Sequence, residues 1–212
     1  MTIQDVVSKR GIKEILHFTT NKGLLGILAS GALKSRARLP NEQLLEYVYE
    51  PNCAERRDGA WLDYVNLSIT KINSRLFGIS SGSWHRSKDV WWCVLAFDPV
   101  VLSHPGVFFA TTNNMYTGVR REQGVKGLDA LFANKIIRWS GNEVYRPKTH
   151  PPHYPTCVQA EALYPKELST DYLRHVYVAT DVHLDVIGGQ CQALRMPMMP
   201  CSVRPDVFSE GL

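Results

Sequence analysis

A glutamate at position 161 lies within a stretch of apolar and small residues, CVQAEALY, at 157–164. The stretch predicts a β-strand, and the two-residue period of a strand places Gln159 and Glu161 on one face together with Leu163. A buried carboxylate has to be paired, protonated or used in chemistry, because burial without a partner is costly. The pattern favours either a carboxylate and an amide that project together into a reactive site, or an edge strand whose polar residues face water.

A histidine at position 17 lies in a second predicted strand, EILHFTT at 14–20, directly before a predicted helix at 20–30. The helix has leucine and isoleucine at helical spacing, and Gly31 follows at the position of a C-terminal cap. An imidazole in this place can hydrogen-bond a ligand hydroxyl, or it can be a satisfied histidine of the core.

Cations gather in a region of the chain that has no acids. Between Asp63 and Asp89 there is no Asp or Glu, while Lys71 and Arg75 follow a predicted strand at 64–70. A planar guanidinium suits bidentate contact with a phosphate, and an ammonium contacts it as a point charge. The residues indicate either a phosphate contact close to that strand or an ordinary solvated surface.

Residues 140–156, SGNEVYRPKTHPPHYPT, include four prolines and predict a long, stiff loop. Arg146 and Lys148 stand in it among aromatic rings, a combination that suits a nucleic-acid backbone with stacked bases. A His-x2-His-x3-Cys run in the same region matches zinc spacing only in part, and we expect no metal.

The chain has 212 residues, of which 44% are hydrophobic and 21% charged, with a net charge of +4. This size predicts one large domain or two small ones with a core of their own. No apolar run reaches about 18 residues, so we expect no transmembrane helix. The N-terminus lacks the long apolar segment of a secretion signal, and five cysteines without a C-x-x-C pair fit a reducing compartment. We therefore expect a cytoplasmic protein without a disulfide framework.

Short strands and short helices follow one another without regular alternation, which predicts an α+β fold with mixed, mostly antiparallel sheets flanked by short helices. We expect a single domain over 1–194, followed by a proline-rich tail at 195–212 that forms a strap or is disordered. Further strands are predicted at 90–98, 107–112 and 175–180, and further helices at 41–50, 124–134 and 181–194, the last with Asp181 as its cap.

Five segments carry a family resemblance. They are HFTTNKGLLGILASGAL at 17–33, YVNLSITKINSRLF at 64–77, WWCVLAFDP at 91–99, FFATTNN at 108–114 and CVQAEALYPKEL at 157–168. Together they resemble the DarT family of nucleic-acid ADP-ribosyltransferases, over about residues 12–185. The resemblance implies the NAD-dependent ADP-ribosyltransferase fold, with NAD as co-substrate, and a place among bacterial toxins and phage-defence effectors.

The resemblance also implies roles for individual residues. Glu161 corresponds to the catalytic glutamate, and His17 and Thr19 correspond to the pair that holds the nicotinamide-side ribose and amide of NAD. Gln159 stands where the wider fold recognises the acceptor, and 140–156 corresponds to the substrate-binding loop. The other residues that the resemblance assigns to NAD are Phe18, Gly31 and Ser68, and those that it assigns to the substrate are Lys71, Arg146 and Lys148.

One segment departs from the family pattern. DarT proteins usually carry a catalytic arginine shortly after the strand that corresponds to 64–70, within an R-S-P-M-like run. This chain has KINSRLF there, so Arg75 is displaced by a few residues and Lys71 is the alternative. We expect Arg75, or failing it Lys71, to be the catalytic cation.

The resemblance predicts an NAD-dependent ADP-ribosyltransferase that modifies a nucleobase in single-stranded DNA or RNA, because duplex bases are shielded. The glutamate would stabilise the oxocarbenium-like centre that forms when the nicotinamide–ribose bond breaks. A toxic activity of this kind implies a cognate antitoxin. The alternatives are an ADP-ribosyltransferase acting on protein, an RNA 2′-phosphotransferase of the same fold, and a catalytically inactive nucleic-acid-binding module.

Overall fold

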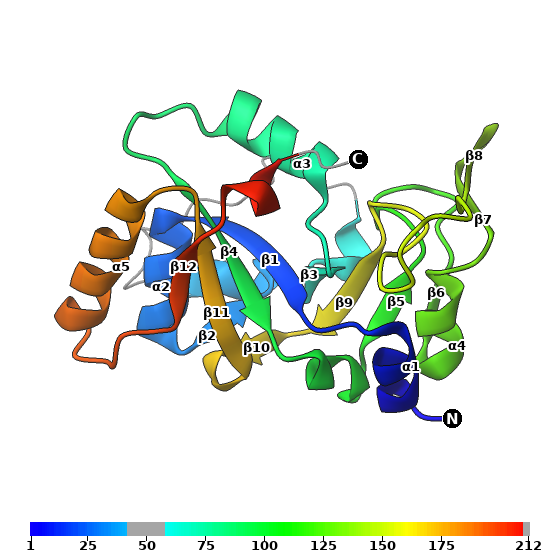
Figure 1. Cartoon of the computed structure of the whole chain (residues 1–212), viewed down its shortest axis with the longest axis horizontal. Helices are drawn as coiled ribbons and strands as arrows, with labels where there is room; N and C mark the ends of the chain where they lie inside the picture. The colour runs from blue at the N-terminus through cyan, green and yellow to red at the C-terminus, as the bar shows by residue number, and fades with distance from the viewer. Residues whose placement is uncertain (42–57, 210–212) are drawn as a thin grey trace.

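An eight-stranded, mostly antiparallel sheet forms the centre of the protein, with short helices around it (Figure 1). The computed structural model describes residues 1–41 and 58–209. The order of strands across the sheet is β12-β11-β4-β1-β3-β9-β5-β6. Their bounds are β1 Ile15–Thr20, β3 Tyr64–Ile69, β4 Trp92–Phe97, β5 Phe108–Ala110, β6 Arg121–Gln123, β9 Glu161–Pro165, β11 Leu173–Val178 and β12 Cys201–Val203.

Two small antiparallel pairs accompany the main sheet. One pair is β2 (Ala32–Lys34) with β10 (Glu167–Ser169), and the other is β7 (Lys135–Trp139) with β8 (Asn142–Tyr145). The helices are α1 (Ile3–Arg10), α2 (Asn21–Ser30), α3 (Ser74–Ile79), α4 (Gly124–Ala130) and α5 (Asp181–Ala193). The predicted α+β fold with mostly antiparallel strands is confirmed.

The sheet opens in its middle, between β1 and β3. Along β1 all six residues pair with β4, from Ile15 opposite Phe97 to Thr20 opposite Trp92. On its other side β1 pairs with β3 only at Ile15 and Leu16 within the described chain. Beyond these pairs the two strands diverge, and we call the resulting gap the split. A split sheet provides a place where a ligand can reach the backbone of two strands.

Local sequence explains why α2 follows β1 directly. The Thr20 hydroxyl accepts a hydrogen bond from the Gly23 N–H and caps the first turn, and Gly31 ends the helix with φ 70°. Caps of this kind satisfy backbone groups that the ends of a helix leave unpaired. The predicted helix at 20–30 and its glycine cap are therefore confirmed.

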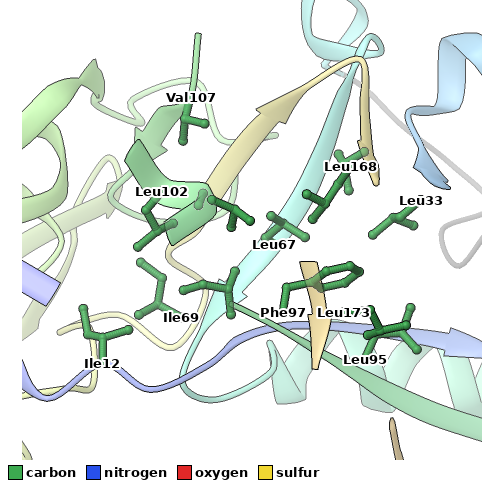
Figure 2. Packing of buried hydrophobic residues seen from close by; sticks show 14 of the residues in the cluster. Ile12, Leu33, Leu67, Ile69, Leu95, Phe97, Leu102, Val107, Leu168 and Leu173 are labelled. Atoms are coloured by element: carbon green, nitrogen blue, oxygen red, sulfur yellow. The ribbon is translucent and has the colours of Figure 1, made fainter. Parts of the chain in front are cut away.

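The main core lies on one face of the sheet, where α1, α2, α4 and α5 cover it. Figure 2 shows Leu67 and Ile69 of β3 in the same hydrophobic cluster as Leu95 and Phe97 of β4. On the opposite face a smaller cluster joins Phe18 of β1 to aromatic residues of α3 and the C-terminal segment. Both faces of the centre are thus buried, which fits strands that read as continuous apolar runs.

Three predicted elements differ from the structure, and a fourth is not tested by it. The predicted strand 157–164 begins only at Glu161, because 157–160 form a turn closed by a bond from Ala160 N to Cys157 O. The predicted loop 140–156 begins with β8, whose residues pair with β7. The helix predicted at 124–134 ends at Ala130, and the helix predicted at 41–50 lies outside the described residues.

The start of the last helix and the C-terminal tail also differ from the predictions. The N-terminal cap of α5 is Thr180 rather than the predicted Asp181. The tail predicted as a strap or as disordered carries β12, which pairs in parallel with β11 from Cys201 opposite Val176. In the described part of the chain, none of the helices has the length and apolar character needed to span a membrane.

Candidate active site

Glu161 is the first residue of β9 and is 4% exposed. Its carboxylate Oε2 accepts a hydrogen bond of 2.8 Å from the backbone N–H of Asn114. Glu161 lies opposite Ala110 of β5, and the register between β3 and β9 places Ser68 on its other side. The structure therefore holds a buried carboxylate at the start of β9, level with Ser68, the last β3 residue that pairs with β1 before the split.

The loop between β5 and β6 surrounds this carboxylate with further polar groups. Asn114 Nδ2 donates to Asp58 Oδ2 at 2.6 Å, and Asn114 Oδ1 accepts from Arg121 Nε at 2.5 Å. Arg121 Nη2 also donates to the backbone oxygen of Asn114 at 2.6 Å, and its guanidinium lies 5.1 Å from the ring centre of Trp61. Burial lowers the pKa of Arg121, while the charges of Asp58 and Glu161 oppose that shift.

Our reading of the sequence missed this cluster. Asn114 belongs to FFATTNN, which carried the family resemblance without a role for its last residue, and Arg121 stands in a surface-like basic run. The polar residues directly after the apolar strand β5 were the one available signal. Asp58 and Trp61 are brought to them from a distant part of the chain.

His17 lies on β1 at the point where the strands diverge. Its Nδ1 is 3.0 Å from the backbone oxygen of Asn66, and its ring runs nearly parallel to that of Phe18. A backbone carbonyl of a strand lies near the plane of the sheet, so the imidazole turns into the split. Burial lowers the pKa of His17 to about 4, and the bond to Asn66 offsets only part of that shift.

His17 and Glu161 stand on opposite sides of β3, which is the one strand between β1 and β9. The pairing registers place the two residues at neighbouring levels, because Leu16 lies opposite Ser68 and Ala162 lies opposite Leu67. The two residues that the sequence singled out thus lie at neighbouring levels on either side of β3.

Three buried polar atoms on β3 and in the turn after it have no hydrogen-bond partner in the described structure. They are Oδ1 of Asn66 on β3, Oγ1 of Thr70 and Nδ2 of Asn73 in the turn that follows. Thr70 also has φ 64°, which is strained for a β-branched residue. Unpaired buried groups and backbone strain concentrate at functional sites, so a polar ligand in the split fits this environment.

The predicted cations after β3 occupy different places. Arg75 is exposed on α3, and its guanidinium makes no hydrogen bond or ion pair with another described residue. Lys71 lines a cavity of about 210 Å³ with Arg138 of β7 and Tyr154 of the following loop. Ser68 is buried, and its hydroxyl accepts from the N–H of Asn73. Catalysis by Arg75 stays a prediction, and the structure places Arg121 beside the glutamate instead.

Gln159 is 3% exposed and sits in the turn before β9. The sequence predicted that Gln159 and Glu161 share a strand face, and this is wrong because Gln159 is not in the strand. Its Oε1 accepts a hydrogen bond of 3.1 Å from the hydroxyl of Tyr116, whose ring packs edge-on against Trp139. The amide is held two residues from the carboxylate by an aromatic pair.

The proline-rich loop is braced from within by Arg146. Its Nη1 donates to the backbone oxygen of Tyr154 and to the Thr156 hydroxyl, and its Nη2 donates to the backbone oxygen of Pro151. Lys148 is exposed in the same loop. The loop thus has one basic residue that holds its shape and another that faces solvent.

The partial zinc pattern does not form a metal site within the described residues. His150 Nε2 lies 3.0 Å from the backbone oxygen of Pro155, and Cys157 Sγ lies 3.3 Å from the Thr112 hydroxyl. Each of these groups contacts a different partner in the protein.

The start of α2 completes the surroundings of His17. Thr19 is 4% exposed, and a Cβ added at Gly23 would lie 2.2 Å from its hydroxyl oxygen. The glycine therefore lets the first turn of α2 approach β1 closely. Phe18 faces the opposite cluster with Phe77 and Trp92, so its ring packs in the core.

A profile of the family described as ssDNA thymidine ADP-ribosyltransferase, DarT, matches residues 16–209. The chain belongs to this family. The predicted membership of the DarT family is therefore confirmed, and with it the prediction of an ADP-ribosyltransferase that acts on single-stranded nucleic acid. Among curated proteins, a search finds no match.

Solved DarT structures share this fold. The chain of Thermus sp. 2.9 DarT in complex with NAD+ is 16% identical, with a TM-score of 0.67 over 93% of this chain and 98% of that one. The same protein in complex with ADP-ribosylated ssDNA is 15% identical, with a TM-score of 0.67 over 94% and 97%. Thermosipho africanus DarTG in complex with ADP-ribose is 14% identical, with a TM-score of 0.56 over 92% of this chain and 51% of that one.

Proposed function

We propose that this DarT-family protein transfers ADP-ribose from NAD+ to thymidine in single-stranded DNA, with Glu161 as its catalytic carboxylate. The family description names this acceptor, and the Thermus relative was solved with NAD+ and with ADP-ribosylated ssDNA. The single observation that carries the assignment of the site is the buried Glu161 carboxylate on β9, fixed by the Asn114 N–H one strand beyond the split that His17 borders.

The chemistry requires a carboxylate at this place. The bond between nicotinamide and the ribose C1 breaks, nicotinamide leaves with the electron pair, and positive charge develops on the ribose. A buried, fixed carboxylate stabilises that charge more strongly than water does. Thymidine has one ring N–H, at N3, so a bond from N3 to C1 requires loss of that proton, which the Glu161 carboxylate accepts as general base.

His17 supports the proposal through its hydrogen bond. A carbonyl oxygen only accepts, so Nδ1 carries the proton that it donates to Asn66, and Nε2 of the neutral ring is an acceptor. That acceptor suits a ribose hydroxyl. The unpaired polar atoms of Asn66 and Asn73 fit further contacts to NAD+, while Lys71 and Lys148 supply positive charge for the DNA backbone.

Transfer to single-stranded oligonucleotides is the test of this proposal. With NAD+ and a thymidine-containing DNA oligonucleotide, we expect the protein to add one ADP-ribose mass to the DNA. Glu161→Gln keeps the shape and removes the charge, so it should lower the rate by at least about 100-fold while oligonucleotide binding stays within twofold. The matched control Glu122→Gln, on strand β6 on the far side of β5, should keep the wild-type rate.

Three results would each overturn a different part. Modification of an RNA oligonucleotide or of added protein, but not of DNA, would contradict the acceptor. Full activity of Glu161→Gln would contradict the catalytic residue. Binding of the oligonucleotide without transfer by the wild-type protein would favour the inactive nucleic-acid-binding module.

A cognate antitoxin and a toxic role belong to the same proposal. Transfer of ADP-ribose to thymidine blocks the base edge that pairs in replication, so unopposed activity would arrest growth. Expression of the wild-type protein in a bacterial host should therefore inhibit growth, and expression of Glu161→Gln should not.

A further inference from the structure

Asn114 is fixed in its loop by hydrogen bonds to three other residues. It is 1% exposed, its amide is bonded to Asp58 on one side and to Arg121 on the other, and its own N–H points at Glu161. Both oxygens of Asn114 accept from the same guanidinium. The side chain and the peptide of this residue are therefore fixed together.

The planar guanidinium of Arg121 is suited to these two hydrogen bonds with Asn114. A guanidinium presents its donors in a rigid plane, so bonds from Nε and Nη2 to two oxygens of one residue fix that residue's orientation. The residue opposite Arg121 in the sheet is Ala110, which in turn pairs with Glu161. Arg121 on β6 and Glu161 on β9 thus lie at the same level of the sheet, with Ala110 of β5 between them.

The charges of the cluster also depend on Arg121. Asp58 and Glu161 are both buried, and the guanidinium interacts electrostatically with each of them. Trp61 covers its plane. Two carboxylates buried close to one another disfavour joint ionisation unless a cation accompanies them. Arg121 provides that cation, although the sequence analysis did not assign it to the site.

We infer that Asn114 and Arg121 are positioning residues for the reaction, which hold the Glu161 carboxylate in one orientation through the Asn114 N–H. The inference rests on the proposed role of Glu161. Neither residue needs to touch NAD+ or DNA for this. Displacement of a reacting group by about 1 Å can cost 100-fold in rate. Loss of the hydrogen bonds that orient Glu161 should therefore affect the chemical step rather than binding.

Arg121→Ala and Asn114→Ala test the inference in the full-length protein. We expect kcat to fall by about 10- to 100-fold, while the KM for NAD+ and the Kd for the oligonucleotide change less than threefold. Arg121→Lys keeps the charge and loses the fork, so its kcat should lie between those of Arg121→Ala and the wild type. The neighbouring variants Arg120→Ala and Asn113→Ala are matched controls and should keep the wild-type kcat.

The results separate this inference from the proposed function. If Glu161→Gln is inactive while Arg121→Ala and Asn114→Ala keep the wild-type kcat, the positioning role is wrong and the catalytic role of Glu161 stands. A rise in KM alone would also overturn the positioning role, because it would place the two residues in substrate binding. If Arg121→Ala does not fold, the kcat and KM of Arg121→Lys decide by the same criteria. Full activity of Glu161→Gln would overturn both proposals.

Discussion

The imidazole of His17 on β1 is bonded to the backbone carbonyl of Asn66 on β3, with 3.0 Å between Nδ1 and the oxygen. This bond crosses the split directly after the last pair between the two strands, Leu16 with Ser68. It fixes the ring where the sheet opens and sets its tautomer, because a carbonyl can only accept. The position of the histidine and the opening of the sheet are therefore one structural feature.

The low pKa of His17 predicts a dependence of stability on pH. Burial lowers it from 6.5 to about 4, so between these values the unfolded chain binds a proton that the folded protein excludes. The free energy of unfolding should therefore fall as the pH drops from about 6.5 to 4, by roughly 3 kcal/mol from this residue. Urea unfolding between pH 7 and pH 4 measures the fall, and His17→Gln should reduce it.

The matched control is His153→Gln, which removes a histidine of the proline-rich loop and should leave the pH dependence unchanged. Equal pH dependence in the wild type and His17→Gln would contradict the lowered pKa of the imidazole. The same pKa keeps His17 neutral at pH 7, so its contribution to NAD+ binding should be constant from pH 6 to pH 8.

Gln159 is predicted to act on the acceptor rather than on NAD+. An amide both donates and accepts, and the hydroxyl of Tyr116 holds this one from the side. Gln159→Ala should lower kcat/KM for a thymidine oligonucleotide by about 10-fold, while hydrolysis of NAD+ without an acceptor continues at the wild-type rate. Gln192→Ala, on the exposed side of α5, is the control. A loss shared equally by transfer and NAD+ hydrolysis would show that Gln159 serves the glutamate instead.

The sequence predicted the parts of the site that local patterns define. The strand around His17, its helix and the Gly31 cap depend on neighbours in the chain, and the structure has all three. Glu161 was identifiable because a charge inside an apolar run is unusual. In contrast, the turn at Gln159 shifted the start of β9, since the prolines before it and the bond from Ala160 to Cys157 override the alternating pattern.

Long-range contacts explain what the sequence did not predict. Arg121 is beside Glu161 only because β6, β5 and β9 are neighbours in the sheet, although the two residues are far apart in the chain. No local sequence pattern indicates whether Arg75 lies close to Glu161. In the structure α3 exposes the Arg75 side chain to solvent. The identity of the cation at the site therefore depends on strand order, which composition and spacing do not encode.

Arg146 is predicted to stabilise the proline-rich loop from within. It donates three hydrogen bonds to groups of 151–156, so Arg146→Ala should lower the free energy of unfolding by about 2–4 kcal/mol. It should also speed amide hydrogen exchange in 147–157. Wild-type stability and exchange in this variant would contradict the bracing role and return Arg146 to the substrate-binding role that the sequence predicted.

Lys148 provides the contrast, because it is exposed in the same loop. Lys148→Ala should leave the melting temperature unchanged and should reduce the salt dependence of oligonucleotide binding. One lost phosphate contact lowers the slope of log K against log salt by about 0.7 for a single strand. An unchanged slope would remove Lys148 from the DNA contact.

Gly23 is predicted to be essential for the close approach of α2 to β1. A Cβ at this position would lie 2.2 Å from the Thr19 hydroxyl oxygen, so Gly23→Ala must displace Thr19 or the first turn of the helix. We expect a raised KM for NAD+ and a melting temperature lowered by several degrees. Gly189→Ala is the matched control, since α5 has open space there and alanine favours a helix by about 0.5–1 kcal/mol over glycine. Stabilisation by both substitutions alike would show that α2 does not need this contact with β1.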